Sequence, residues 1–284
     1  MNSMATDISR HMMKGSNDSL FEPDYLTILK DFVKRLVKRE LHLPPWWLRD
    51  VGGSDFIATG QEFLELFIRV GNLQPDEHIL EIGCGSGRMA IPLTRYVSSD
   101  GAYKGIDVVK QSIAWCQQHI SRRHSNFCFL HADLYNKRYN PAGRYQAKDY
   151  TFPFQDACFD FVLLTSVFTH LLPEDTKRYL LEIARLLRQN GRGFFTFFLL
   201  NETQQTLARQ RRNDIQFKYG TDLCRMRDES VPESALAYDE EYLLELLSAC
   251  GLELCAPIHY GTWSGREEGL SYQDILLVQR KSYP

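Results

Sequence analysis

The sequence has little net charge, no paired cysteine motif and no long apolar run. It contains 33 lysine and arginine residues against 36 acidic residues, so its formal net charge is −3 at pH 7. A chain this close to neutral lacks the positive excess that is typical of nucleic-acid-binding proteins. We therefore expect no nucleic-acid partner. RNA recognition stays an alternative if basic side chains gather in a local groove.

The cysteines are also unremarkable in their spacing. Seven of them are scattered along the chain, and none forms a CxxC pair. This pattern predicts neither a disulfide framework nor a metal site, and it fits a reducing compartment. Residues 1–19 lack the apolar core of a signal peptide, and the longest apolar runs, such as 194–200, are too short to span a bilayer. We expect a cytoplasmic protein without a membrane span.

What the sequence does have is an alternation of short apolar runs with helical patterns from residue 73 onward. Strands are predicted at 78–82, 103–106, 127–131, 159–164, 193–199, 252–259 and 274–279. Helices are predicted between them at 88–97, 110–121, 174–188 and 239–250. Such alternation is typical of an α/β fold, a parallel sheet with helices on both faces. Its ligand should lie beyond the carboxyl ends of the strands.

Three further segments flank or interrupt this domain, which we place at 73–284. Residues 1–20 are polar and are predicted to be a mobile tail. Residues 21–72 are predicted to form a helical cap, and the polar stretch at about 200–238 is predicted to form a lid insertion. The first cap helix, 24–41, has lysines between its apolar positions. A helix docked on the domain is the favoured interpretation, and a helix lying on a membrane is the alternative.

The most informative motif is a glycine-rich turn after the first predicted strand. Glycines stand at positions 83, 85 and 87 of Ile82-Gly-Cys-Gly-Ser-Gly-Arg88. Glycine permits positive φ and lets a ligand approach the backbone, and the following helix offers free N–H groups. A dinucleotide fingerprint would place its third glycine where Arg88 stands. The turn therefore suits a nucleoside ligand without a pyrophosphate better than NAD.

Carboxylates follow the next strands at positions that face the same edge. Asp107 ends the second strand, where it can accept both ribose hydroxyl protons or cap the next helix. Asp133 follows the third strand, where it can accept the adenine amine or form a turn, with Leu134 beside it. Glu81, within the first strand, is expected to be buried and paired, either with loop amides or with a ligand's ammonium group.

Taken together, these motifs resemble those of the class I S-adenosylmethionine-dependent methyltransferases, small-molecule type. The matching stretches are LEIGCGSGR (80–88), GID (105–107), HADL (131–134) and FPFQDACFDFVLLTSVFTHL (152–171). The resemblance implies a Rossmann-like three-layer sandwich with a seven-stranded, mostly parallel sheet and an antiparallel last strand. It also implies S-adenosyl-L-methionine as cofactor. The turn is shared with a few non-catalytic relatives, so a cofactor-binding protein without transferase activity is an alternative.

The resemblance assigns roles to individual residues. The cofactor-binding set that it implies is Glu81, Gly83, Cys84, Gly85, Gly87, Asp107, Val108, Asp133, Leu134, Thr165 and Ser166. Within this set the glycines would hold the methionine and ribose, Val108 would lie against the adenine, and Thr165 and Ser166 would line the methyl-transfer site.

Methyl transfer to an oxygen or nitrogen can require a base that removes the acceptor's proton. His170, just after the fourth strand, is the best-placed candidate, with a structural histidine bonded to backbone as the alternative. His131 and His259 are weaker candidates. Aromatic residues in the cap and insertion suggest an apolar or ring-containing acceptor. We expect a small-molecule acceptor and favour O-methylation of a metabolite or sugar-like compound, while an RNA methyltransferase stays an alternative.

Overall fold

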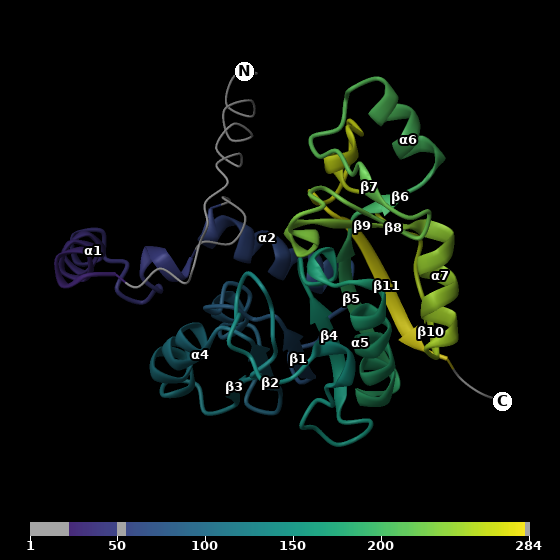
Figure 1. Cartoon of the computed structure of the whole chain (residues 1–284). Coiled ribbons are helices and arrows are strands. Elements are labelled where there is room, and N and C mark those ends of the chain that lie inside the picture. The colour runs from purple at the N-terminus through teal and green to yellow at the C-terminus, as the bar shows by residue number, and fades with distance from the viewer. Residues whose placement is uncertain (1–22, 50–54, 282–284) are drawn as a thin grey trace.

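The computed structural model describes residues 23–49 and 55–281, so the predicted tail at 1–20 lies outside the described residues. A seven-stranded sheet forms the centre of the domain, with strand order β10-β11-β5-β4-β1-β2-β3 (Figure 1). Its strands are β1 (His78–Ile82), β2 (Ala102–Asp107), β3 (Phe127–His131), β4 (Phe159–Leu164), β5 (Leu187–Phe197), β10 (Leu252–Leu254) and β11 (Asp274–Arg280).

All neighbouring strands from β3 to β5 run parallel, and β11 runs antiparallel to both β5 and β10. The expected fold class is therefore confirmed: a Rossmann-like α/β sandwich with a mostly parallel sheet. Because the carboxyl ends of the parallel strands share one edge, the segments after β1, β2, β3 and β4 meet there.

Helices cover both faces of the sheet, as the alternating pattern predicted. The helices are α1 (Tyr25–Val37), α2 (Phe56–Arg69), α3 (Ala90–Leu93), α4 (Lys110–Cys116), α5 (Pro173–Leu186), α6 (Glu202–Arg209) and α7 (Glu240–Ala249). One buried cluster contains apolar residues of α5 and α7, and the other contains those of α2, α3 and α4. Each face thus buries one apolar cluster, which is the ordinary source of stability for this architecture.

Three predicted boundaries were wrong. The helix expected at 88–97 is regular only over α3, and the strand expected at 252–259 ends at Leu254. The helix expected to reach residue 188 ends at Leu186, because β5 begins at Leu187 with an irregular register against β4. Pairing across the sheet therefore overrides the local helical pattern at this point.

The insertion has more structure than its polar sequence suggested. It contains α6 and a second sheet of order β6-β9-β8-β7, with β6 (Leu199–Leu200), β7 (Tyr219–Gly220), β8 (Cys224–Met226) and β9 (Leu236–Asp239). Phe198, Phe217 and Trp263 form its small apolar core. Figure 1 places this sheet and α6 at the end of the molecule beyond β4 and β5.

Residues of the N-terminal segment contact the glycine turn. The hydroxyl of Ser86 donates to the carbonyl of Leu48 at 2.6 Å. A Cβ on Gly60 of α2 would lie 2.4 Å from the carbonyl oxygen of Arg88, so α2 packs directly on the turn's backbone. Within the described ranges no helix is long and apolar enough to cross a membrane.

Candidate cofactor and acceptor site

The glycine turn after β1 has the conformation that its sequence predicted. Gly83, Gly85 and Gly87 have φ values of 83°, 50° and 86°, in the region that L side chains rarely adopt. A Cβ on Gly83 would lie 2.4 Å from the Val167 side chain, whereas one on Gly85 would meet no described atom within 4 Å. The turn therefore packs tightly at its first glycine and leaves space over its second.

Asp107 joins the end of β2 to this turn. Its Oδ2 accepts from the amide of Gly85 and its Oδ1 from the amide of Val109, each at 2.7 Å. Burial raises the pKa of Asp107, while the two amides act in the opposite direction. The residue at the N-cap of α4 is Val109, so the alternative that Asp107 caps this helix is wrong. Each carboxylate oxygen keeps a lone pair that a ribose hydroxyl could use.

Glu81 lies beneath the turn and is 1% exposed. Its carboxyl oxygen receives the hydroxyl of Tyr103, which is the partner that a buried carboxyl requires. Burial raises the pKa of Glu81 to about 8, against the opposing effects of Tyr103 and of the positive charge on Arg88. Burial therefore favours the protonated form of the Glu81 carboxyl.

The segment after β3 carries the remaining carboxylate. Asp133 binds Arg144 at 2.6 Å and Asn140 at 3.3 Å, and Arg144 lowers the pKa of Asp133. Leu134 is buried, and its amide donates to the carbonyl of Ala132 at 2.8 Å. Leu134 would thus offer an adenine ring an apolar surface, and its amide is already engaged. Val108 is half-buried near the end of β2.

Cys84 contributes backbone rather than a thiol to the turn. Its side chain is 2% exposed, and a Cβ on Gly105 would lie 2.9 Å from its sulfur. Burial raises the pKa of Cys84 well above its usual range, so the thiol stays protonated. The sulfur fills the space between β1 and β2, and the backbone of the same residue faces the turn.

At the end of β4 the chain is strained and tied to two other strand ends. Thr165 is buried, and Ser166 has a φ of 60°. The Ser166 amide donates to the Thr196 hydroxyl at 2.7 Å, and both hydroxyls donate to Oε1 of Gln273, at 2.9 and 2.7 Å. A strained residue held by several partners is common at functional sites. We name Ser166, Thr196 and Gln273 the strand-end cluster.

Sequence reasoning singled out Ser166 but missed Thr196 and Gln273. Thr196 lies within an apolar strand, and Gln273 directly precedes β11, more than a hundred residues from Ser166. Neither position belongs to a recognisable motif. Only the antiparallel pairing of β11 with β5 brings Gln273 to the edge where β4 ends.

His170 connects this edge to the insertion. Its Nδ1 lies 2.7 Å from the carbonyl oxygen of Glu233, in the 3-10 turn Pro232–Ser234. Since a carbonyl only accepts, Nδ1 carries the proton and Nε2 keeps its lone pair. Burial lowers the pKa of His170, which favours the neutral ring. His170 is thus bonded to a backbone carbonyl, as the alternative of a structural histidine predicted. Its Nε2 could nevertheless accept a proton, as a general base must.

Three aromatic residues of the regions considered for the acceptor pocket are used in packing. Phe198 and Trp263 belong to the apolar core beside the second sheet, and Phe56 is buried at the start of α2. Tyr260 is different: its hydroxyl donates to Glu240 at 2.9 Å, and its ring lies under the guanidinium of Arg266. Its side chain is half-buried.

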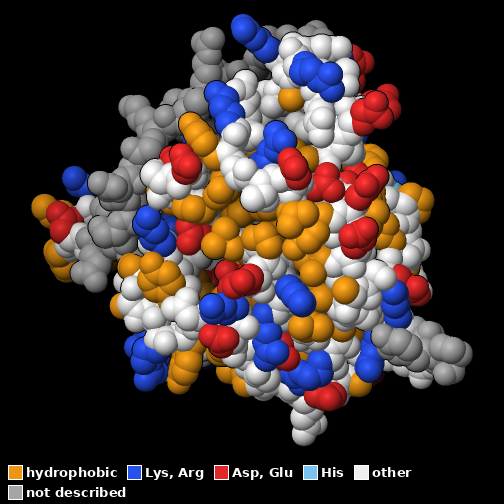
Figure 2. Space-filling view, turned by 45° about the vertical axis from the view of Figure 1, so that its right-hand side comes forward, with side chains coloured by type: hydrophobic (Ala, Val, Ile, Leu, Met, Phe, Trp, Pro, Cys, Tyr) orange, Lys and Arg blue, Asp and Glu red, His pale blue; other side chains and the backbone are white. Residues whose placement is uncertain are grey.

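The insertion's basic residues do not join the strand-end cluster. Arg209 and Arg211 line a separate cavity of about 460 Å³ together with Lys218 and Arg225, and Arg212 pairs with Glu267. In Figure 2 several lysine and arginine side chains lie at the end of the molecule that the insertion forms. Within the described ranges no group of three or more His, Cys, Asp or Glu residues could hold a metal ion.

Comparisons with known proteins agree with this fold. A family model described as a methyltransferase domain matches residues 80–195. A curated Haemophilus influenzae protein, described as uncharacterized, is 26% identical over 152 residues, which are 50% of this chain and 55% of that protein. The match thus spans about half the length of this curated relative.

Solved structures show the same fold at low sequence identity. A Pyrococcus horikoshii protein has a TM-score of 0.52 at 15% identity, over 79% of this chain and 90% of its own. The 1,6-didemethyltoxoflavin-N1-methyltransferase of Burkholderia thailandensis, solved with S-adenosylhomocysteine, has a TM-score of 0.52 at 16% identity, over 93% of each chain. A glycopeptide N-methyltransferase has a TM-score of 0.52 at 10% identity, over 80% and 91%.

The fold, the glycine turn and the family match define a class I S-adenosylmethionine-dependent methyltransferase domain. Residues 80–195 match a methyltransferase domain, and S-adenosylmethionine is the cofactor that this domain implies. The residues present fit that group: open space lies over Gly85, and a carboxylate with spare lone pairs lies beside it.

Proposed function

We propose that the chain transfers the methyl group of S-adenosylmethionine to a hydroxyl of a small-molecule acceptor. The cofactor, when bound, supplies an electrophilic methyl group. The protein's part is to orient the acceptor and to receive its proton. The acceptor would lie between the strand-end cluster and the insertion, with the cofactor held by the residues of the glycine turn, Asp107 and Asp133.

The proposal that the acceptor group is a hydroxyl rests on the protonation state of His170. A neutral amine has a lone pair and can be methylated before it loses a proton, whereas an alcohol is a poor nucleophile until its proton begins to leave. The carbonyl of Glu233 fixes the proton on Nδ1, and burial keeps the ring neutral. Nε2 is therefore available to receive the acceptor's proton, so the geometry favours O-methylation.

Gln273 is the residue that we propose to orient the acceptor. Its Oε1 receives two hydroxyl protons, and its Nε2 makes no hydrogen bond to any described group. An amide held in this way presents two donors at the edge where β4, β5 and β11 meet. A polar acceptor atom, such as a ring or sugar oxygen, could accept from it. Arg266, seven positions before Gln273, lies over the ring of Tyr260.

The test is transfer of labelled methyl from S-adenosylmethionine into metabolite extracts, followed by identification of the labelled product. We expect a product with an ether methyl group, formed by the wild-type chain. Gln273→Ala should raise the KM for the acceptor and leave cofactor affinity unchanged, whereas Gln279→Ala, at the far end of the same strand, should change neither. Labelled N-methyl products would refute O-methylation, and cofactor binding without any product would favour a non-catalytic binding protein.

A further inference from the structure

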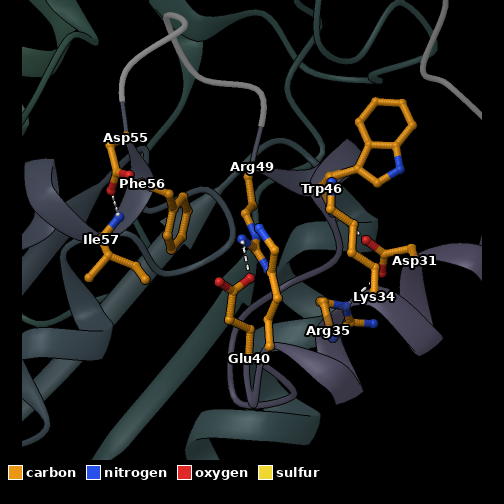
Figure 3. Close-up of a pocket in the computed structure, with 10 residues that line it drawn as sticks. Asp31, Lys34, Arg35, Glu40, Trp46, Arg49, Asp55, Phe56 and Ile57 are labelled. Carbon is orange, nitrogen blue, oxygen red and sulfur yellow. Dashed lines mark hydrogen bonds and ion pairs between the residues drawn. The ribbon is translucent and has the colours of Figure 1, made fainter.

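The first helix of the cap faces the protein with its polar side. Asp31 of α1 is 4% exposed and binds Arg35 at 2.6 Å, and its other oxygen receives the Trp46 amide at 3.4 Å. Arg35 in turn donates to the carbonyl of Leu43 at 2.9 Å. In Figure 3 the side chains of Asp31, Lys34 and Arg35 extend from α1 toward the pocket beside Trp46 and Arg49.

The opposite side of α1 is apolar and exposed. Tyr25, Leu29, Phe32 and Leu36 form one row at helical spacing, with exposed fractions of 77%, 45%, 46% and 52%. Leu26, Val33 and Val37 form a second row and are 60%, 48% and 78% exposed. An amphipathic helix normally buries this side against the core. The sequence-based interpretation of α1 as a helix docked on the domain by its apolar side is therefore wrong for the described residues.

A row of lysines begins at the border of this apolar face with Lys30 and turns onto the polar side of the helix with Lys34 and Lys38, which line the pocket. Lys30, Lys34 and Lys38 are four residues apart and so lie one above another on the helix. The segment 23–49 contains six lysine and arginine residues against three acidic ones, although the whole chain has a net charge of −3. Trp46, at the end of the same segment, is 51% exposed. Positive charge and exposed apolar side chains are thus concentrated on one projecting part of the molecule (Figure 1).

We propose that α1 is an interfacial helix that binds the chain to an anionic lipid surface. A helix with apolar side chains on one face and lysines on the adjoining polar side is the kind that lies in a membrane interface, where long lysine side chains extend to the lipid phosphates. Its 13 residues extend about 20 Å, so it would lie flat in the interface. Trp46 is suited to the same depth because its ring is amphipathic.

The charge pattern favours lipid over an antiparallel pair of α1 helices. In an antiparallel pair of α1 helices joined by their apolar faces, the two-fold axis brings both lysine rows to the same side. Like charges would then lie next to each other without an acidic partner. Anionic headgroups remove this repulsion and complement all three lysines. The proposal is independent of the acceptor's identity.

The experiment is flotation of the full-length chain with vesicles of phosphatidylcholine alone or of phosphatidylcholine with phosphatidylserine. We expect binding to the anionic vesicles only, and release by high salt because the Debye length shortens. Leu29→Glu with Leu36→Glu should abolish flotation. The matched control is Leu223→Glu with Leu270→Glu, whose leucines are 47% and 48% exposed elsewhere on the surface and should have no effect.

A second pair of variants tests the charges. Lys34→Gln with Lys38→Gln should lower vesicle affinity roughly tenfold or more, whereas Lys148→Gln with Lys177→Gln should leave it unchanged. Light scattering of the same proteins measures their mass in solution. Absence of flotation with anionic vesicles overturns the proposal, as does equal flotation with both vesicle types. A dimer that the leucine variants on α1 dissociate would assign the face to a second copy instead.

Discussion

The carboxylate of Asp107 holds the amide of Gly85 at 2.7 Å, so the end of β2 fixes the turn that follows β1. The same carboxylate holds the amide of Val109 with its other oxygen. One side chain therefore shapes the turn and presents its remaining lone pairs at the edge of the sheet.

Asp107→Ala should weaken S-adenosylmethionine binding by about 1–3 kcal/mol, because ribose hydroxyls lose a charged acceptor and the turn loses a hydrogen bond. Titration calorimetry measures this loss. Asp100→Ala, at an exposed turn on the opposite edge, is the control and should bind as the wild type does. Unchanged affinity in the Asp107 variant would remove the residue from the cofactor site.

Alanine substitutions at two positions of the glycine turn should distinguish an effect on folding stability from an effect on cofactor affinity. In Gly83→Ala the new Cβ would lie 2.4 Å from Val167, so thermal stability should fall strongly. In Gly85→Ala no described atom is within 4 Å, so the loss of stability should be limited to the positive φ, about 1–2 kcal/mol. Cofactor affinity should nevertheless fall in Gly85→Ala, since its methyl group would occupy ligand space. A Gly85→Ala protein with normal affinity would place the cofactor elsewhere.

The rate of methyl transfer should depend on the protonation of His170. Burial lowers its pKa below the usual value of about 6.5, so the base form persists to lower pH than for an exposed histidine. The rate should fall as pH decreases through this lowered pKa. His170→Gln should reduce kcat roughly a hundredfold and abolish that limb of the profile, whereas His42→Gln, exposed in the cap, should preserve both. Equal turnover in the His170 variant would make the histidine structural.

Glu81 should make stability depend on pH. The folded protein retains its proton up to about pH 8, while the unfolded chain releases it near pH 4.5. Its contribution to stability is therefore fully present below pH 4.5 and is lost as pH rises to about 8. Denaturant unfolding of Glu81→Gln should show a smaller decrease between pH 5 and 8 than the wild type. Glu245→Gln, exposed on α7, should retain the wild-type decrease.

The fold and the cofactor turn could be predicted because their signals are local. Gly83, Gly85 and Gly87 are close in sequence, and each adopts the positive φ for which glycine is suited. The strand-end cluster could not be predicted, because Gln273 reaches Ser166 only through the pairing of β11 with β5. The predicted end of the helix before Leu187 was wrong for a related reason, because the start of β5 depends on its pairing with β4 in the sheet.

The sequence alone determined the alternating elements, the glycine turn and the carboxylates at the ends of β2 and β3, because each depends on the conformational preferences of residues close together in the chain. The tertiary structure decided the partners: Tyr103 for Glu81, Glu233 for His170, and Gln273 for Ser166. It also decided that α1 shows its apolar side to the outside. Periodicity identifies an amphipathic helix, but only packing determines which of its faces meets the protein.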